Sequence, residues 1–285
     1  MVEIIAHRGA RSIAPENTLA AARLAWELGA HRWETDVSFT RDGHLVLFHD
    51  HTLSRCTDAP ARFGYPDSGV PGASPRPEDT LIHYTLAELA TLDLGSVFLS
   101  RDPFSTIARG EIEEPALSSF KGEKIPTLEQ GLILTRDLGF QVNVELKDHG
   151  NDPESFSLAA QTLEIIKNTN IPLETVTISS FNHDWLNWVG SRAPGIEIQA
   201  LVGDDDEIPL DFKDFSFMTY NVNARLITEK GVRDLKARGK KVNLFTVNDP
   251  HEVSRFISAG ADGIITDFPQ RFVAKNKGPE KQAIT

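Results

Sequence analysis

The feature of this sequence that most restricts its fold is a regular alternation of strand-like and helix-like segments over most of its 285 residues. Short apolar, β-branched runs alternate with longer segments whose apolar residues recur at helical spacing. This rhythm is typical of βα units, and eight strands favour closure into a (β/α)8, or TIM, barrel over the alternative, an open doubly wound sheet. Leaving aside the return strand of one hairpin, the predicted strands are 2–7, 31–39, 140–147, 175–181, 196–202, 215–220, 241–248 and 261–267.

One region departs from this rhythm. Residues 57–125 are rich in Pro, Gly, Ser and Asp, with one short predicted helix at 85–95. Loops longer than about 15 residues are uncommon unless they act as lids, bind ligands or are disordered. We therefore interpret 57–125 as an insertion after the second strand and its hairpin partner (44–50), able to cover part of the active site. The predicted organisation is a single barrel domain over 1–275 with a polar tail at 276–285.

Composition and charge argue against several classes of function. The net charge is −12, from 41 acidic and 29 basic side chains, so a broad basic surface for nucleic acid is not expected. Cys56 is the only cysteine, which rules out an intrachain disulfide and is compatible with a reducing compartment. We see no signal peptide and no stretch of about 18 apolar residues, so we expect a cytoplasmic protein without a membrane span. The sequence does not indicate an oligomeric state.

Acidic residues on two predicted strands are the first sign of chemistry. Glu34 and Asp36 lie two residues apart and so share one face of their strand, while their apolar neighbours suit the helix-covered face. Glu145 lies toward the C-terminal end of another strand, the end where barrel active sites are built. Three converging carboxylates repel one another unless a cation compensates them, and oxygen ligands alone suit Mg²⁺ or Ca²⁺ better than Zn²⁺. The alternative is ion pairing, for example of Lys147 with Glu145.

Histidines stand at the same ends of these elements. His7 ends the first strand and His49 ends the hairpin strand, so both can reach one pocket. Two histidines can divide general-acid and general-base duty near neutral pH, because the unperturbed pKa of imidazole is about 6.5. Arg8 and Lys147 would add fixed positive charge that suits a phosphate group. These residues predict a local anion site in an otherwise acidic protein.

The segment PENT at 15–18 lies where a loop enters the first predicted helix. Glu16 and Asn17 therefore have two interpretations. Asn17, with Pro15, is a common residue at the start of a helix, where its side chain can cap the first turn. The other interpretation is a direct role for Glu16 and Asn17 in the site.

Seven segments resemble, in order, the signatures of the glycerophosphodiester phosphodiesterase family. The resemblance runs from the first predicted strand to the last, and the first two segments together are the most specific. The segments are HRGARSIAPENT (7–18), ETDVSFTRDGHLVLFHD (34–50), PTLEQGL (126–132), VELK (144–147), SSF (179–181), FTVND (245–249) and GADGIITDFP (260–269).

The resemblance implies a (β/α)8 barrel that hydrolyses glycerophosphodiesters, such as glycerophosphocholine or glycerophosphoethanolamine, to an alcohol and glycerol 3-phosphate with one divalent metal ion. It also implies a metal-ligand set, an acid/base pair and a substrate site. Phe245 departs from the family pattern, which more often has Trp, but still offers an aromatic wall. The implied metal ligands are Glu34, Asp36 and Glu145, the acid/base pair is His7 and His49, and the substrate residues are Arg8, Lys147, Glu16, Asn17 and Phe245.

Two alternatives share this site. A lysophospholipase D-like or phosphoinositide-type phosphodiesterase acts on lipids and would need an apolar rim. The insertion offers aromatic residues for such a rim, unless they form its own small core. A non-catalytic barrel that binds phosphorylated metabolites would lack a metal ligand or a histidine, and here all are present. The aromatic candidates are Phe63, Tyr65, Phe98, Phe104 and Phe120.

Overall fold

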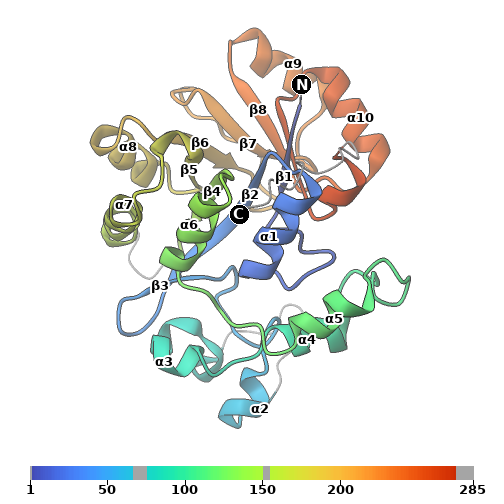
Figure 1. Ribbon diagram of the computed structural model, residues 1–285. Coiled ribbons are helices and arrows are strands. Elements are labelled where there is room, and N and C mark those ends of the chain that lie inside the picture. The colour runs from blue at the N-terminus through green and yellow to red at the C-terminus, as the bar shows by residue number, and fades with distance from the viewer. Residues whose placement is uncertain (1, 67–75, 150–154, 274–285) are drawn as a thin grey trace, which may run out of the picture.

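The computed structural model describes residues 2–66, 76–149 and 155–273 and shows a closed barrel surrounded by helices (Figure 1). Eight parallel strands follow one another in the order β1-β9-β8-β7-β6-β5-β4-β2, and pairing of β1 with β2 closes the ring. The prediction of a (β/α)8 barrel is thus confirmed. The barrel strands are β1 (Glu3–Ala6), β2 (Arg32–Phe39), β4 (Val142–Leu146), β5 (Val176–Ser180), β6 (Glu197–Val202), β7 (Thr219–Asn223), β8 (Lys241–Phe245) and β9 (Gly263–Thr266).

The ninth strand, β3 (Leu45–Leu47), lies outside the ring. It pairs antiparallel with the end of β2, with Val37 opposite Leu47, as the hairpin pattern predicted. This hairpin extends β2 beyond the barrel and brings His49, which follows β3, to the C-terminal end of the barrel strands.

Helices cover the outside of the barrel, where the apolar residues of the strands point. Trp33 of β2 is fully buried, and its indole Nε1 donates a hydrogen bond to Thr135 in α6 over 2.9 Å. Thr18 caps the first helix by accepting from the backbone N–H of Ala21, and Gly29 ends it in the left-handed conformation. The covering helices are α1 (Leu19–Leu28), α6 (Leu128–Asp137), α7 (Ser157–Thr169), α8 (His183–Arg192), α9 (Glu229–Ala237) and α10 (Pro250–Ala259).

One strand lies elsewhere than its pattern predicted. The apolar run at 215–220 indicated a strand, but β7 spans Thr219–Asn223. Asn221 faces the interior of the barrel, where its Oδ1 accepts a hydrogen bond from Asn243 over 2.9 Å. Asparagine is depleted in strands, so a polar barrel interior weakens the strand signal of the residues that line it.

The insertion forms a separate layer of short helices beside the barrel (Figure 1). Leu81 and Leu89 pack with Val46 and Phe48 of the hairpin, while Phe98 and Phe120 are buried against the first loop and α1. The predicted helix 85–95 is shorter than expected, because α3 ends at Leu89 and a new helix begins at Gly95. The α-helices in the described part of the insertion are α2 (Ala59–Phe63), α3 (Leu86–Leu89), α4 (Gly95–Arg101) and α5 (Glu114–Phe120), and two short 3-10 helices lie at Pro77–Asp79 and Leu81–His83.

Within 2–66, 76–149 and 155–273, none of the helices combines the length and the apolar character that crossing a bilayer requires. The predicted tail at 276–285 lies outside the described residues.

Replacing Gly9 by alanine should destabilise the fold markedly. Gly9 has φ 80°, and an added Cβ would lie 2.7 Å from the carbonyl carbon of Ala21. Overpacking and left-handed strain add, so we expect the free energy of unfolding to fall by about 2 kcal/mol or more. Gly110 is the matched control, since it has φ 68° with no atom within 4 Å of the added Cβ, and should lose only about 1 kcal/mol. Equal losses in urea denaturation would contradict the steric argument.

Candidate active site

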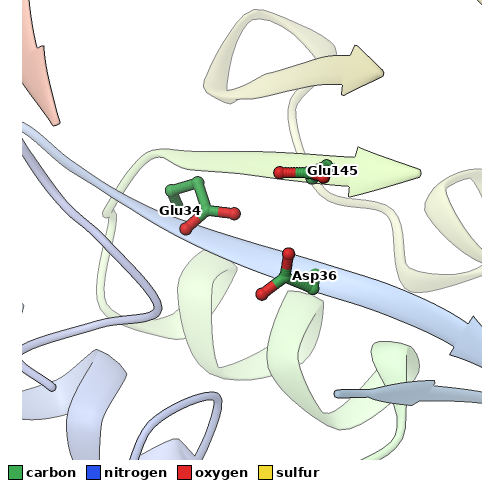
Figure 2. Close-up of side chains that lie close together, drawn as sticks. All are labelled: Glu34, Asp36 and Glu145. Carbon is green, nitrogen blue, oxygen red and sulfur yellow. The ribbon is translucent and has the colours of Figure 1, made fainter. Parts of the chain in front are cut away.

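Three carboxylates from two neighbouring strands lie close together. Glu34 and Asp36 project from β2 and Glu145 from β4, with Asp36 directly opposite Glu145 in the register (Figure 2). One oxygen from each lies within 4.8 Å of the others. We call these three residues the acidic triad. The spacing of two on one strand therefore does bring both side chains to one face, as the sequence predicted.

The acidic triad has the donors that a divalent cation needs. Glu34 is 3% exposed and Asp36 is fully buried, yet Glu34 Oε1 and Asp36 Oδ1 have no hydrogen-bond partner among the described residues. Their second oxygens are held, since Glu34 Oε2 accepts from the backbone N–H of Arg8 and Asp36 Oδ2 from Asn17 Nδ2, each over 2.9 Å. A buried carboxylate oxygen without a partner is costly, and a hard cation would supply one. The triad therefore fits Mg²⁺ or Ca²⁺.

Ion pairs with basic side chains, the alternative to a cation, form in part. Lys147 Nζ lies 2.8 Å from Glu145 Oε1 and 3.8 Å from Asp36 Oδ1, and Arg8 Nε lies 3.4 Å from Asp36 Oδ2. Burial alone would raise the pKa of Asp36, but the charges of His49, Arg8 and Lys147 hold it below its usual value. The pKa of Glu34 shifts in the opposite direction. Burial and the neighbouring acids of the triad raise its pKa well above its usual value, so these ion pairs do not compensate the whole triad.

His7 directly follows β1, and its ring is held in place by a carboxylate. Its Nδ1 lies 2.6 Å from Asp267 Oδ1, and its Nε2 lies 4.0 Å from Glu34 Oε2. Burial lowers the pKa of His7 to about 4, and the charge of Arg8 contributes, while Asp267 opposes the shift. His7 is therefore neutral at pH 7, with its Nε2 directed to the acidic triad.

His49 follows β3 and is held in the same way. Its Nδ1 lies 2.7 Å from Asp50 Oδ1, and its side chain is 29% exposed. In both histidines a carboxylate occupies Nδ1, which leaves Nε2 for a ligand. Each of the two rings is therefore held at Nδ1 by an aspartate, although His7 follows β1 and His49 follows β3.

One cavity of about 190 Å³ brings most of the predicted site residues together. His7 and His49 line it, and so do Arg8, Lys147 and Phe245. Asp36 lies beneath this surface, fully buried. Among the described residues of the insertion none lines this cavity, and the predicted cover of the active site stays a prediction.

Phe245 is part of an aromatic wall. Its ring meets that of Phe181 edge to face with 6.1 Å between centroids, and both rings line the cavity. Phe181 was not singled out from the sequence, although it stands directly after β5, at the same end of the barrel as His7.

Glu16 and Asn17 do not line this cavity. They contact Arg8 and Asp36, respectively. Asn17 does not cap the helix, because that role belongs to Thr18. With φ 55° and 1% exposure, Asn17 instead donates to Asp36 and accepts from the Thr35 hydroxyl over 2.7 Å. Glu16 is bound by arginine side chains, which are described below. Asn17 thus orients an acid of the triad, and the substrate contact that the resemblance implies for Glu16 and Asn17 stays a prediction.

Sequence reasoning also missed the carboxylates that hold the histidines. Asp50 follows His49 directly, and Asp267 follows β9, at the C-terminal end of a barrel strand. The rule that selected His7, a polar residue at the end of a strand, could have selected Asp267 as well. Their pairing could not be predicted, because 260 positions separate Asp267 from His7.

The chain is similar to known proteins over most of its length. The sequence model of the glycerophosphoryl diester phosphodiesterase family matches residues 7–271. A glycerophosphodiester phosphodiesterase of Caldanaerobacter subterraneus subsp. tengcongensis is 34% identical over 274 residues, covering 95% of this chain and 96% of the relative. The human glycerophosphoinositol inositolphosphodiesterase GDPD2 is 29% identical over 93% of this chain but only 46% of its own length.

A solved structure shows the same architecture. An Oleispira antarctica phosphodiesterase in complex with the product sn-glycerol-3-phosphate superposes with a TM-score of 0.72 at 28% identity, covering 94% of each chain. The match of the family model extends from His7 at the end of β1 past β9, and so includes the whole candidate site. The chain therefore belongs to the glycerophosphoryl diester phosphodiesterase family, and it is a phosphoric diester hydrolase.

Proposed function

We propose that the chain hydrolyses glycerophosphodiesters, such as glycerophosphocholine or glycerophosphoethanolamine, to an alcohol and glycerol 3-phosphate. The observation that carries this proposal is the meeting of the acidic triad, two basic side chains and two carboxylate-held histidines around one cavity. The complex of the Oleispira antarctica phosphodiesterase with sn-glycerol-3-phosphate supports the choice of product.

In the proposed mechanism the acidic triad holds one divalent cation, Mg²⁺ or Ca²⁺. Bound there, the cation supplies Lewis-acid stabilisation of charge on the phosphoryl oxygens. Arg8 and Lys147, which line the cavity, bind and orient the same phosphate by charge-assisted hydrogen bonds. The aromatic wall of Phe181 and Phe245 flanks the organic part of the substrate.

Lowering the pH should weaken cation binding at the acidic triad. Because the pKa of Glu34 is raised, this residue carries a proton below that pKa, and the cation must displace it. Affinity for Mg²⁺ should therefore fall with pH, by up to about tenfold per pH unit for one proton. Calorimetry in two buffers of different ionisation enthalpy counts the protons released. Tight binding without proton release would show that Glu34 is already ionised.

The two histidines transfer the protons. His7 is neutral at pH 7, which suits the base that takes a proton from the attacking hydroxyl, either water or the adjacent hydroxyl of the substrate's glycerol. His49 then protonates the departing alkoxide. In the second route the first product is a cyclic phosphate, which water opens to glycerol 3-phosphate with the two roles reversed.

Product analysis tests the proposed function. Purified protein is incubated with glycerophosphocholine, glycerophosphoethanolamine and glycerophosphoinositol, with Mg²⁺ or Ca²⁺. We expect glycerol 3-phosphate and the free alcohol from at least one of these substrates. Release of free glycerol together with a phosphorylated alcohol would place the cleavage on the other side of the phosphorus and contradict the proposal.

A lysophospholipase D-like activity is the second candidate, and one observation favours it. A neighbouring cavity of about 250 Å³ shares Lys147 with the active site and is lined by apolar residues that include Leu81, Leu158 and Trp185. Against this activity, Phe98 and Phe120 of the insertion are buried against the first loop and α1 and so do not form an exposed apolar rim. Turnover of lysophosphatidylcholine faster than that of glycerophosphocholine would decide for the lipid substrate.

A further inference from the structure

The carboxylates behind the two histidines are themselves held by arginines. Asp267 Oδ1 lies 3.3 Å from Arg11 NH1, and its Oδ2 accepts from Asn248 Nδ2 over 2.8 Å. Asp50 is bound by Arg55 through two bonds, one from Nε and one of 3.0 Å from NH2 to Oδ1. Each histidine thus begins a chain of three side chains, histidine, aspartate and arginine.

Both chains end at the same residue. Arg11 NH2 lies 2.8 Å from Glu16 Oε2, while Arg55 donates to both oxygens of Glu16, over 2.6 and 3.0 Å. Arg8 is the third arginine, and its NH1 donates to Glu16 Oε1 over 2.9 Å. Burial of Glu16 opposes its ionisation, but Arg11, Arg8 and Arg55 hold its pKa well below the usual value. Glu16 is therefore the common carboxylate of three arginines.

We propose that Asp267 and Asp50 are positioning residues for the acid–base pair and that Glu16 is their common anchor, so that both histidines are oriented as one unit. This inference rests on the proposed function. A carboxylate that accepts from Nδ1–H selects the tautomer and fixes the ring, so that Nε2 faces the reacting atoms. The side-chain contacts that meet at Glu16 connect the ends of β1, β3 and β9. β1 and β3 lie near the start of the sequence, whereas β9 lies near its end.

The position of the arginines separates this role from phosphate binding. Arg11 and Arg55 do not line the catalytic cavity, whereas they line a different cavity of about 140 Å³ on the side of α4, together with Glu16. Their charges therefore lie outside the catalytic cavity and reach the histidines only through Asp267 and Asp50. Only Arg8 borders the catalytic cavity and also contacts Glu16, which makes Glu16 a link between the phosphate-binding side and both histidines.

Asparagine substitutions test the two aspartates. Asp267→Asn and Asp50→Asn keep the shape but remove the charge, and we expect kcat to fall by about 10- to 100-fold with KM within about twofold. Asp234→Asn is the matched control, because Asp234 also pairs with a basic side chain, Lys230 at 2.6 Å, but on the exposed face of α9. Variants that retain the kcat of the wild type, or that change KM alone, would overturn the inference.

A change of leaving group separates positioning from mere structural support. The glycerol phosphodiester of 4-nitrophenol needs no proton on its leaving group, so the general acid becomes dispensable. The loss caused by Asp50→Asn should then shrink to a few-fold, whereas that caused by Asp267→Asn should persist. Losses of equal size on both substrates for both variants would indicate structural support only and contradict the assignment.

Glu16→Gln tests the common anchor. It should lower kcat by about tenfold or more on the natural substrate, since both chains loosen together. A downfield NMR signal from Nδ1–H of His7 should be present in the wild type, weakened in Glu16→Gln and lost in Asp267→Asn. An unchanged signal in all three proteins overturns the inference. The NMR measurement does not depend on turnover. A wild type that is inactive on glycerophosphodiesters would therefore contradict only the proposed function.

Discussion

Replacing His7 or His49 by alanine should lower kcat by about 10²- to 10⁴-fold, the usual contribution of one general acid or base. Both rings line the catalytic cavity, and both have Nδ1 bound to a carboxylate, so Nε2 is the atom available for proton transfer. His7 is neutral at pH 7 because burial lowers its pKa to about 4. Its loss should therefore remove the base, and the loss of His49 should remove the acid.

Steady-state kinetics on glycerophosphocholine, with circular dichroism to verify the fold, measure these losses. His251→Ala is the matched control, since His251 is exposed on α10 and should have the kcat of the wild type. On the 4-nitrophenol diester the His49 variant should recover most of its rate, while the His7 variant should not. A His7/His49 double variant with wild-type activity would show that neither ring transfers a proton.

The barrel could be predicted because its signal is local. Trp33, Thr35 and Val37 alternate with Glu34 and Asp36, so the two faces of β2 can be read directly from the residues. The same alternation failed at β7, where Asn221 points into a polar interior and resembles a loop residue. The local pattern therefore misplaced β7, although it located β8, whose Asn243 lies in the same polar interior.

The candidate site could be predicted where its residues end a strand or, like Glu34 and Asp36, alternate along one. His7 and Glu145 were found in this way, and the closed barrel then brought them into one cavity. The partners of Glu16 could not be predicted, because the paths of the β1–α1 loop and of the segment between β3 and α2 decide which arginines reach it. The residues that contact the ligand follow from strand register, whereas those that hold them depend on loop conformation.

Removal of divalent cations should abolish hydrolysis altogether, the largest effect expected for this protein. Without a cation the phosphate of the substrate would face three carboxylates, while Lys147 is paired with Glu145 and Arg8 with Glu16. The unpartnered oxygens of Glu34 and Asp36 would repel it further. Binding and charge stabilisation should therefore both fail, and activity in EDTA should fall below the level of detection.

Restoration identifies the ion. After exhaustive chelation, Mg²⁺ and Ca²⁺ are added back separately, and the ion that restores turnover at the lower concentration is the one the acidic triad prefers. Binding also stabilises the folded state, by about 2.7 kcal/mol at a concentration of 100 Kd, so Tm should rise in the wild type but not in Glu145→Gln. Glu88→Gln, at a half-buried acid of α3 outside the acidic triad, is the control whose Tm should rise with the ion as in the wild type. Full activity in protein shown to be metal-free, without any rise in Tm on adding either ion, would mean that the arginine and lysine alone neutralise the phosphate.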